Sequence, residues 1–517
     1  MPERNQKITF LVLGAVGYMG MNGIRTLQRL NRLVGTDVFD RERFLAVDLD
    51  LARAEARRRP EWQEIATLLG QGPHAIAEFH HARPFLWGLR TADPQGWVII
   101  YDATPSIFHN GHLVQIAADR DPRVIYLGEK PIFTALSDLQ AARRFSPECK
   151  FYCDLIETES PVFRGVTQYL QEERSQVERL WMWRAGSGAL RKALRADREV
   201  VFGGALEDKA LHDFSITLGW LGGARALAAT PPRHIRIQGG RHFCISDRAL
   251  LSQQASFLSM NNGLIASFDH IPTLGEDFHR DRFPADVVTA VDCDWVVNGR
   301  SIPASYLVSW VGVTGSAWED DFRQRWHKAG RLEMPIGQTR ETRHIEQVGR
   351  SFECAVQEVR LAIVECRGRR GRQTVLCNFL GKETFPGLRR FAKVFDEHGQ
   401  LVHIIHEDPQ APAGAAKLQD LADIFKRIIH EIRGEACAEH IGRDATLLTH
   451  ELMLQAHESL RRHVAQQAEA SGDAVRWWQQ AYRRSAALFA ERIRPVAVTA
   501  EETGHTEQTA TSLGSRT

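Results

Sequence analysis

Residues 7–20, KITFLVLGAVGYMG, decide how the N-terminal part of this chain folds. The apolar run that ends at Leu13 predicts a buried strand, and the small residues after it predict a tight turn into a helix. In the G-x-G-x-x-G register, Ala15 replaces the first glycine, and Gly17 and Gly20 occupy the other two positions. Small residues suit a backbone that must approach a pyrophosphate, whose charge is met by N–H groups at the helix start. The residues expected to bind a dinucleotide here are Gly14, Ala15, Gly17, Tyr18, Met19 and Gly20.

The next strand-like run, FLAVD, ends at Asp48. A carboxylate at the carboxyl end of a strand can accept hydrogen bonds from both ribose hydroxyls, and it would repel a 2′-phosphate. The sequence therefore predicts NAD as the cofactor, with NADP as the alternative. A glycine-rich strand–helix turn beside a solvated aspartate is the competing interpretation of both features.

Hydrophobic patterning divides the chain into four parts. Up to about residue 150, short apolar runs alternate with amphipathic segments, which predicts a doubly wound parallel sheet covered by helices on both faces. From 151 to 410, alternating runs predict an α+β domain with a large, open and mostly antiparallel sheet, interrupted by a helix over 204–221. Residues 411–495 read as a helical extension, and 496–517 as a mobile tail.

Composition describes a soluble globular protein. The chain has 517 residues, of which 43% are hydrophobic and 25% charged, which argues against a mainly disordered chain. Sixty-five basic and 64 acidic side chains leave a net charge of +1, so no global field favours nucleic acid or an anionic membrane. The eight cysteines form no Cys-x-x-Cys pair, the N-terminus lacks a signal-peptide pattern, and no apolar run is long enough to span a membrane. We expect a cytoplasmic protein with reduced thiols.

Two further strand ends carry a resemblance to a known family. WVIIYD is followed by ATPSIFH, and RVIYLG by Glu129-Lys130-Pro131. These stretches look like the T-P-x-x-x-H and E-K-P signatures of the Gfo/Idh/MocA oxidoreductases, which include glucose-fructose oxidoreductase and inositol dehydrogenase. GGALEDKALHDF, at 203–214, is similar to that family's G-G-x-L-x-D-x-x-x-H-D segment. The resemblance covers residues 7 to about 223. It implies a Rossmann domain, an α+β domain whose open sheet forms a homo-oligomer (dimer or tetramer), and an active site between the two domains.

The resemblance also implies site residues. Lys130, Asp208 and His212 match the family positions that surround the reacting carbinol carbon, where the nicotinamide accepts or donates a hydride. Asp208 and His212 are four residues apart, so on an α-helix they share a face. We expect His212 to transfer the hydroxyl proton and Lys130 to polarise the oxygen, with the reverse assignment open; Asp208 would orient the histidine or bind a substrate hydroxyl. The residues expected along the nicotinamide side are Thr104, Pro105, His109, Glu129 and Lys130, with a structural role as the alternative for His109.

Several other features lie outside these motifs. Where many relatives have an arginine-containing stretch, residues 157–161 read ETESP, so the family's substrate contacts are not carried over to this segment. The run 367–372 is predicted to be a hairpin turn. Side chains that we interpret as a solvated basic face, and not as an anion site, are Arg191, Lys192, Arg195 and Arg198. Four neighbouring side chains of types that can bind metal ions are also discounted as a metal site: His403, His406, Glu407 and Asp408.

Together these observations predict an NAD(P)-dependent oxidoreductase. It would transfer a hydride between the nicotinamide and a hydroxyl or keto carbon of a sugar, cyclitol or related polyhydroxylated compound, with no metal, nucleic acid or membrane partner. One alternative is a redox-neutral lyase or glycosidase that oxidises its substrate transiently. Another is a non-catalytic dinucleotide-binding regulator, against which the presence of Lys130, Asp208 and His212 argues.

Overall fold

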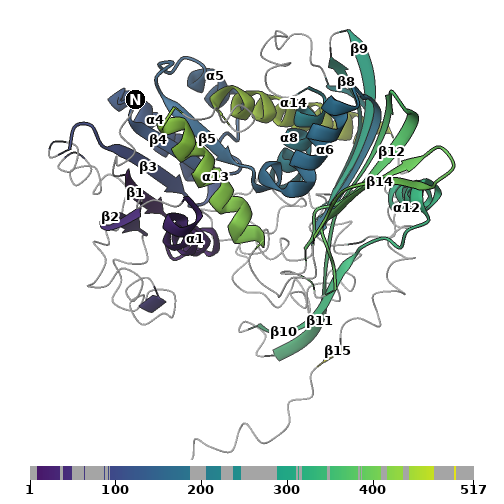
Figure 1. The fold of residues 1–517 in the computed structure, drawn as a ribbon, viewed down its shortest axis with the longest axis horizontal. Coiled ribbons are helices and arrows are strands. Elements are labelled where there is room, and N and C mark those ends of the chain that lie inside the picture. Colours follow the sequence, from purple (N-terminus) through teal and green to yellow (C-terminus); the bar gives the residue numbers. More distant parts are fainter. Residues whose placement is uncertain are drawn as a thin grey trace, which may run out of the picture.

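The computed structural model contains two β-sheets, with helices packed between them (Figure 1). The residues that the structure describes are 8–34, 39–48, 63–64, 87, 91, 93–186, 205–222, 237–245, 288–297, 299–309, 313, 317–345, 350–381, 385, 387–408, 416–434, 442–470 and 494–495.

The first sheet is parallel, with the strand order β2-β1-β3-β4-β5. Its strands are β1 (Ile8–Leu13), β2 (Phe39–Val47), β3 (Trp97–Asp102), β4 (Val124–Glu129) and β5 (Lys150–Asp154). All six residues of β1 are buried, as expected for a strand covered on both faces. The chain adds β2 on one side of β1 and then β3, β4 and β5 on the other side, so the strand order reverses between β1 and β3. In such sheets ligands bind beyond the carboxyl ends of the strands at that point. The doubly wound parallel sheet predicted from the sequence is confirmed.

Alternate residues of β1 enter two separate cores. Leu11 and Leu13 pack with α4 (Ser106–Asp119) and α5 (Leu136–Ala142) on one face. Phe10 and Val12 pack on the other face with α1 (Tyr18–Val34) and with a helix from near the C-terminus, α13 (Ala416–Ile432). The ring of Phe425, on α13, contacts Phe10 and Tyr101 edge to face. A helix that the sequence assigned to a separate extension therefore covers part of the N-terminal sheet.

The second sheet has ten strands, and β14-β13-β12-β11-β6-β9-β8-β7 form its main path. All pairs are antiparallel except β6 with β9, which confirms the mostly antiparallel sheet that was expected. The strands are β6 (Gln176–Gly186), β7 (Ile237–Ile245), β8 (Val288–Val297), β9 (Arg300–Ser309), β10 (Gly337–Ile345), β11 (Arg350–Gly368), β12 (Gly371–Asn378), β13 (Phe391–Asp396), β14 (Leu401–Glu407) and β15 (Arg494–Pro495).

Helices lie on both sides of this second sheet. The side that faces the first sheet carries α6 (Pro161–Glu172) and α8 (Leu211–Trp220), and the opposite side carries α12 (Ala317–Gly330) (Figure 1). Trp183 of β6 packs edge to face against Trp318 and Phe322 of α12. The long helix α14 (Arg443–Ala470) runs between the two sheets and contacts α5 and β5 on one side and α8 and β7 on the other.

The expected helical extension is therefore present as α13 and α14, up to Ala470. Residues 494–495 form a short strand paired with β11, where the sequence predicted the last residues of the helical region. The strand forms because Arg494 and Pro495 meet the edge of β11 at Glu353 and Phe352. The expected tail, 496–517, lies outside the described residues.

Candidate functional site

The glycine-rich turn after β1 has room only for glycine at its first position. Gly14 has a positive φ of +70°, and a Cβ there would lie 2.8 Å from the carbonyl carbon of Ala103, in the loop after β3. A Cβ on Gly20 would collide with the carbonyl oxygen of Gly14. Helix α1 starts at Tyr18, so the N–H groups of its first turn lack acceptors within the helix and point toward this edge of the sheet. The structure therefore has a tight glycine turn between β1 and the start of α1.

Asp48 lies beside this turn, directly after β2. Its Oδ2 accepts a hydrogen bond of 2.9 Å from the backbone N–H of Val16. The contact fixes the carboxylate at the carboxyl edge of the sheet, next to the turn, where a ribose that follows the pyrophosphate would come.

The loop after β3 is organised around a buried carboxylate. Asp102 accepts hydrogen bonds from the backbone N–H and the hydroxyl of Thr104, and from Nδ1 of His112. Burial would raise the pKa of Asp102, but His109 and His112 lower it far below its usual value. The carboxylate is therefore ionised and holds Thr104 in place.

His109 connects the loops that follow β3 and β4. Its Nε2 lies 2.7 Å from the carbonyl oxygen of Thr104, and its Nδ1 lies 2.9 Å from that of Pro131. The side chain is only 1% exposed. Because both ring nitrogens face backbone oxygens, neither is available to a cofactor. These contacts favour the structural alternative for His109, and a place beside the nicotinamide stays a prediction.

Glu129, at the end of β4, lies next to this loop. Its Oε1 accepts a hydrogen bond of 3.3 Å from the hydroxyl of Tyr101, which also bonds to Oδ2 of Asp154 at 3.0 Å. Burial and the two carboxylates raise the pKa of Tyr101 well above its usual value, so the phenol keeps its proton. Tyr101 thus joins the carboxyl ends of β4 and β5.

Lys130 is paired with Asp208 across the gap between the two sheets. Its Nζ donates to Oδ1 of Asp208 at 2.5 Å and also to the backbone oxygen of the same residue. Burial alone would lower the pKa of Lys130, but Asp208 and Glu129 raise it above its usual value. Lys130, which precedes a cis peptide bond to Pro131, is therefore charged and held by the second domain.

The helix that carries Asp208 and His212 is not a regular α-helix. Residues Leu206–Ala210 form a π-helical turn, η4, which continues into α8 at Leu211. The sequence predicted that both side chains share one face and suggested that Asp208 orients the histidine. In the structure Asp208 contacts Lys130, whereas His212 contacts Glu157. Such π-helical turns occur frequently at functional sites.

Nδ1 of His212 lies 2.5 Å from Oε2 of Glu157. Burial lowers the pKa of His212 to about 4 and outweighs the opposing effect of Glu157, so the imidazole is neutral at pH 7. A neutral histidine with Nδ1 this close to a carboxylate carries its proton on Nδ1, which leaves the lone pair on Nε2. The contact therefore selects the form of His212 that can accept a proton at Nε2.

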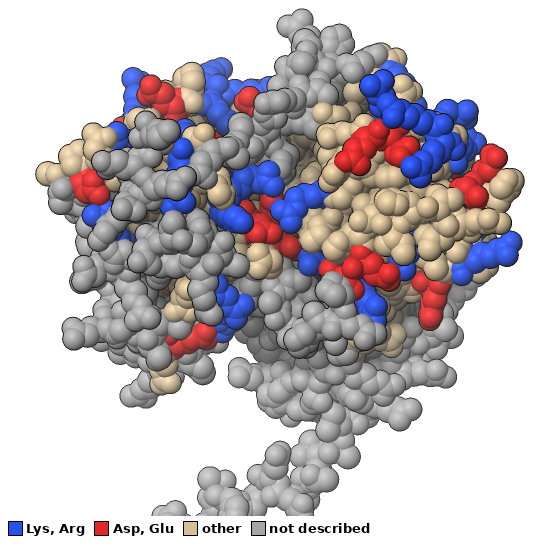
Figure 2. All heavy atoms as spheres, in the orientation of Figure 1, with Lys and Arg blue, Asp and Glu red and all other residues tan. Residues whose placement is uncertain are grey.

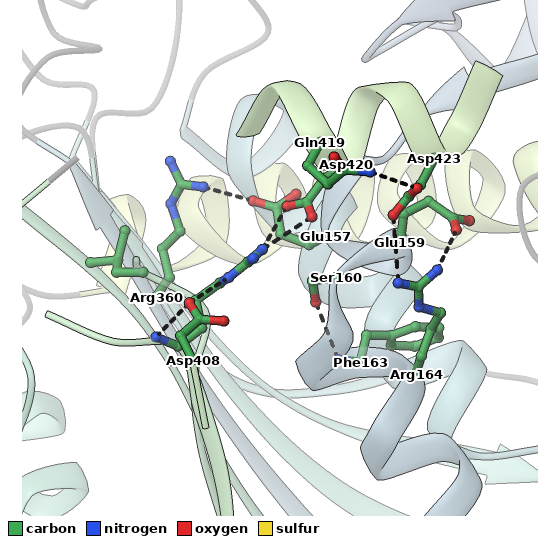
Figure 3. Close-up of polar contacts among 12 residues, drawn as sticks. Glu157, Glu159, Ser160, Phe163, Arg164, Arg360, Asp408, Gln419, Asp420 and Asp423 are labelled. Carbon is green, nitrogen blue, oxygen red and sulfur yellow. Dashed lines mark hydrogen bonds and ion pairs between the residues drawn. The ribbon is translucent and has the colours of Figure 1, made fainter. Parts of the chain in front are cut away.

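Glu157 is the site residue that the sequence did not reveal. It lies in the short helix η3 (Ile156–Glu159), and its Oε1 accepts hydrogen bonds from Arg184 at 2.7 Å and Arg360 at 3.0 Å. Burial would raise the pKa of Glu157, but the close Nδ1–H of His212 and the charge of Arg184 lower it well below its usual value. Figure 3 shows Glu157 between Arg360 of β11 and Asp420 of α13. Its only sequence signal was its position just beyond β5, at the edge where site residues gather.

Further charged groups surround this centre. Nε of Arg184 donates to Asp213 at 2.8 Å, and burial raises the pKa of Asp213 to about 6 against the opposing effect of Arg184. Burial lowers the pKa of Lys209 to about 8, with Asp208 and Glu358 opposing that shift. Figure 2 shows acidic and basic side chains gathered in the hollow between the two halves of the molecule. A polar substrate would meet charged groups of both signs here.

Other side chains singled out in the sequence have local partners. His406 lies 2.9 Å from Asp408, Glu407 accepts from Lys393, and His403 stacks on Tyr169. Within the described residues no group of three or more His, Cys, Asp or Glu side chains could hold a metal ion. The predicted turn at 367–372 is confirmed, since β11 and β12 form a hairpin there. The basic residues 191–198 lie outside the described residues.

The part of the chain that the structure describes contains no helix long and apolar enough to cross a lipid bilayer.

A two-domain architecture, with a doubly wound sheet of the dinucleotide-binding type followed by a large mixed sheet, is shared with solved oxidoreductases. The structure of levoglucosan dehydrogenase in complex with NADH and levoglucosan is similar to this chain with a TM-score of 0.52 and 11% identity, over 88% of this chain and 97% of that one. Aldose-aldose oxidoreductase from Caulobacter crescentus complexed with glycerol gives a TM-score of 0.50 and 11% identity, over 89% and 98%. No family model matches the chain, and no curated protein does. At these identities the similarity is one of fold.

Proposed function

We propose that this protein is an NAD-dependent oxidoreductase that transfers a hydride between the nicotinamide and a hydroxyl or keto carbon of a sugar, cyclitol or related polyhydroxylated compound. The observation that carries the proposal is the pair of contacts Lys130–Asp208 and His212–Glu157, close enough together that Lys130 affects the pKa of His212. Solved proteins of the same fold were crystallised with NADH and levoglucosan or with glycerol, which supports the cofactor and the substrate class.

The residues at the edge of the first sheet fit a dinucleotide. The turn at 14–20 would hold the pyrophosphate, because Gly14 and Gly20 allow its backbone to fold tightly against Ala103 and upon itself just before the start of α1. Asp48, next to that turn, would accept the ribose hydroxyls and disfavour the 2′-phosphate of NADP. Thr104, Pro105 and Glu129 would lie beside the nicotinamide. When bound, the nicotinamide supplies the hydride acceptor or donor.

The side chains of the second domain handle the proton. In the direction of oxidation, Nε2 of His212 takes the proton of the substrate hydroxyl, so that the oxygen becomes a carbonyl as the hydride leaves the carbon. Lys130 donates a hydrogen bond to the same oxygen and stabilises its alkoxide character. Asp208 holds the ammonium of Lys130, and Glu157 holds the imidazole of His212. The reverse assignment, with Lys130 as the proton-transfer group, requires a lower pKa than its contact with Asp208 gives it.

A substrate panel with two matched variants tests this function. We expect purified protein to form NADH from NAD and at least one sugar or cyclitol, and His212→Ala and Lys130→Ala to lower kcat by about 10²-fold or more while still binding NADH. Unchanged turnover in both variants would refute these roles. Product without net NADH would point to the redox-neutral lyase or glycosidase, and NADH binding without any turnover would point to the regulator.

A further inference from the structure

Helix α14 reaches both segments that carry the Lys130–Asp208 pair. Two of its histidines, His450 and His457, are seven residues apart, which places them on the same face of the helix two turns apart. This face points toward the loop after β4 and toward the π turn η4. Figure 1 shows α14 passing between α5 of the first domain and α8 of the second.

His450 supports the loop that carries Lys130. The side chain is fully buried, and its Nε2 accepts a hydrogen bond of 2.9 Å from the backbone N–H of Ile132. Its Nδ1 lies 2.7 Å from the carbonyl oxygen of Thr446, one helical turn earlier, and its ring packs edge to face on Phe133. An Nε2 that accepts requires the proton on Nδ1, and both contacts satisfy that form of a neutral ring. The backbone just after Lys130 is thus held by one specific form of His450.

His457 supports the turn that carries Asp208. Its Nδ1 lies 2.8 Å from Oε1 of Glu207, the residue that precedes Asp208 in η4. Both side chains are largely buried, so the contact is shielded from water. On each side of the Lys130–Asp208 pair, a histidine of α14 therefore contacts a residue that is at most two positions away in the chain, namely Ile132 and Glu207.

We infer that α14 is a positioning element of the active site, and that His450 and His457 hold the Lys130 loop and the Asp208 turn at the separation that pairs the two side chains. The inference rests on the proposed function, in which Lys130 polarises the substrate oxygen. It gives the C-terminal extension a role in catalysis, without any contact between α14 and the substrate. His450 and His457 are positioning residues, because they act through Ile132 and Glu207.

Two substitutions at His450 separate positioning from packing. His450→Phe keeps the ring volume and the contact with Phe133 but removes the acceptor for the N–H of Ile132. In His450→Gln, the side-chain oxygen can take the place of Nε2 as acceptor. Leu452→Ala is the matched control, because it removes a buried side chain of α14 that lies on another face of the helix. All three variants are compared with wild type at temperatures where each is folded.

The first readout is hydrogen exchange of the peptide that contains Ile132, followed by mass spectrometry, which requires no activity. We expect His450→Phe to exchange this amide about tenfold faster or more, and His450→Gln and Leu452→Ala to remain close to wild type. The second readout is steady-state kinetics. A displacement of Lys130 should lower kcat by up to about 10²-fold in His450→Phe with little change in the KM for NAD, and the glutamine variant should recover most of it.

The corresponding pair for the contact with η4 is His457→Leu and His457→Asn, in which the asparagine can replace Nδ1 as a donor to Glu207. If the hydrogen-exchange rate of the Ile132 amide is the same in His450→Phe and in wild type, the inference is overturned. A loss of kcat no larger than that of Leu452→Ala would overturn it too. Wild-type protein without oxidoreductase activity would refute the proposed function instead, and the exchange experiment would still decide whether α14 holds the Lys130 loop.

Discussion

Replacing Glu157 by glutamine removes the charge that faces His212 and changes little else in shape. The amide can present its NH2 group to Nδ1 of His212, and the imidazole proton would then move to Nε2. A histidine that already carries a proton on Nε2 cannot accept one from a substrate hydroxyl. We therefore expect Glu157→Gln to lower kcat and to leave NADH binding intact, because the predicted cofactor residues lie on the first sheet.

The size of the effect follows from the contacts of Glu157. A buried hydrogen bond to a charged group contributes about 1.5–3 kcal/mol, and each 1.36 kcal/mol in the barrier is a factor of ten in rate. The predicted loss of kcat is therefore about 10- to 10²-fold. The unfolding free energy should fall by only about 2 kcal/mol, because Arg184 keeps its 2.8 Å contact with Asp213.

Glu159→Gln provides a control from the same short helix. Glu159 is also fully buried and paired with arginines, since its Oε2 accepts from Arg427 at 2.7 Å and lies 3.8 Å from Arg164 (Figure 3). The two variants should lose similar stability in urea unfolding, and only Glu157→Gln should lose turnover in the NADH assay. Equal kcat values in Glu157→Gln and wild type, or equal losses in both variants, would refute the role assigned to Glu157.

Three further predictions concern the cofactor edge and the effect of pH. Asp48→Ala should weaken the preference for NAD over NADP, measured as the ratio of kcat/KM values; a wild type that already prefers NADP would contradict the argument. Gly14→Ala should reduce NADH affinity and lower the free energy of unfolding by about 1–2 kcal/mol, because the left-handed backbone and the loop at Ala103 leave no space for a methyl group. Titration followed by NADH fluorescence measures the first effect, and thermal unfolding measures the second. Burial lowers the pKa of His450 from its usual 6.5 to about 4, so the unfolded chain binds this proton first and stability is lost as the pH falls. Between pH 6.5 and 5 the unfolding free energy of wild type should therefore fall by about 2 kcal/mol more than that of His450→Gln, and parallel urea titrations with equal slopes would contradict this.

The two C-terminal helices approach the site from different sides. Helix α14 contacts the segments of Lys130 and Asp208, whereas α13 lies over η3, which carries Glu157 and Glu159 (Figure 3). Arg390, which precedes β13, links α13 to the second sheet through Asp420 at 3.0 Å and Asp408 at 3.1 Å. The extension is therefore packed against both domains, and its removal should destabilise both of them.

Local patterns in the sequence were sufficient for the parallel sheet and for the glycine-rich turn after its strand β1. An uninterrupted apolar strand, small residues and a helix start are adjacent in the chain, and their physics is local. The family motifs then selected Lys130, Asp208 and His212 because each follows a recognisable element. The pairing of these side chains could not be predicted in the same way. Asp208 meets Lys130 and His212 meets Glu157, both from other elements of the chain, and no pattern in LEDKA signals either contact.

By itself, the sequence determined the two-sheet class of the fold, the glycine-rich turn after β1 and the candidate proton-transfer residues, since each depends on neighbours within one element. Only the tertiary structure decided what surrounds them. Glu157 became a partner of His212, Phe425 came to cover the first sheet, and His450 came to hold the loop of Lys130, because packing brings together residues that are up to several hundred positions apart in the chain. Such contacts depend on the burial of whole faces of helices and sheets, and that burial is a property of the folded molecule.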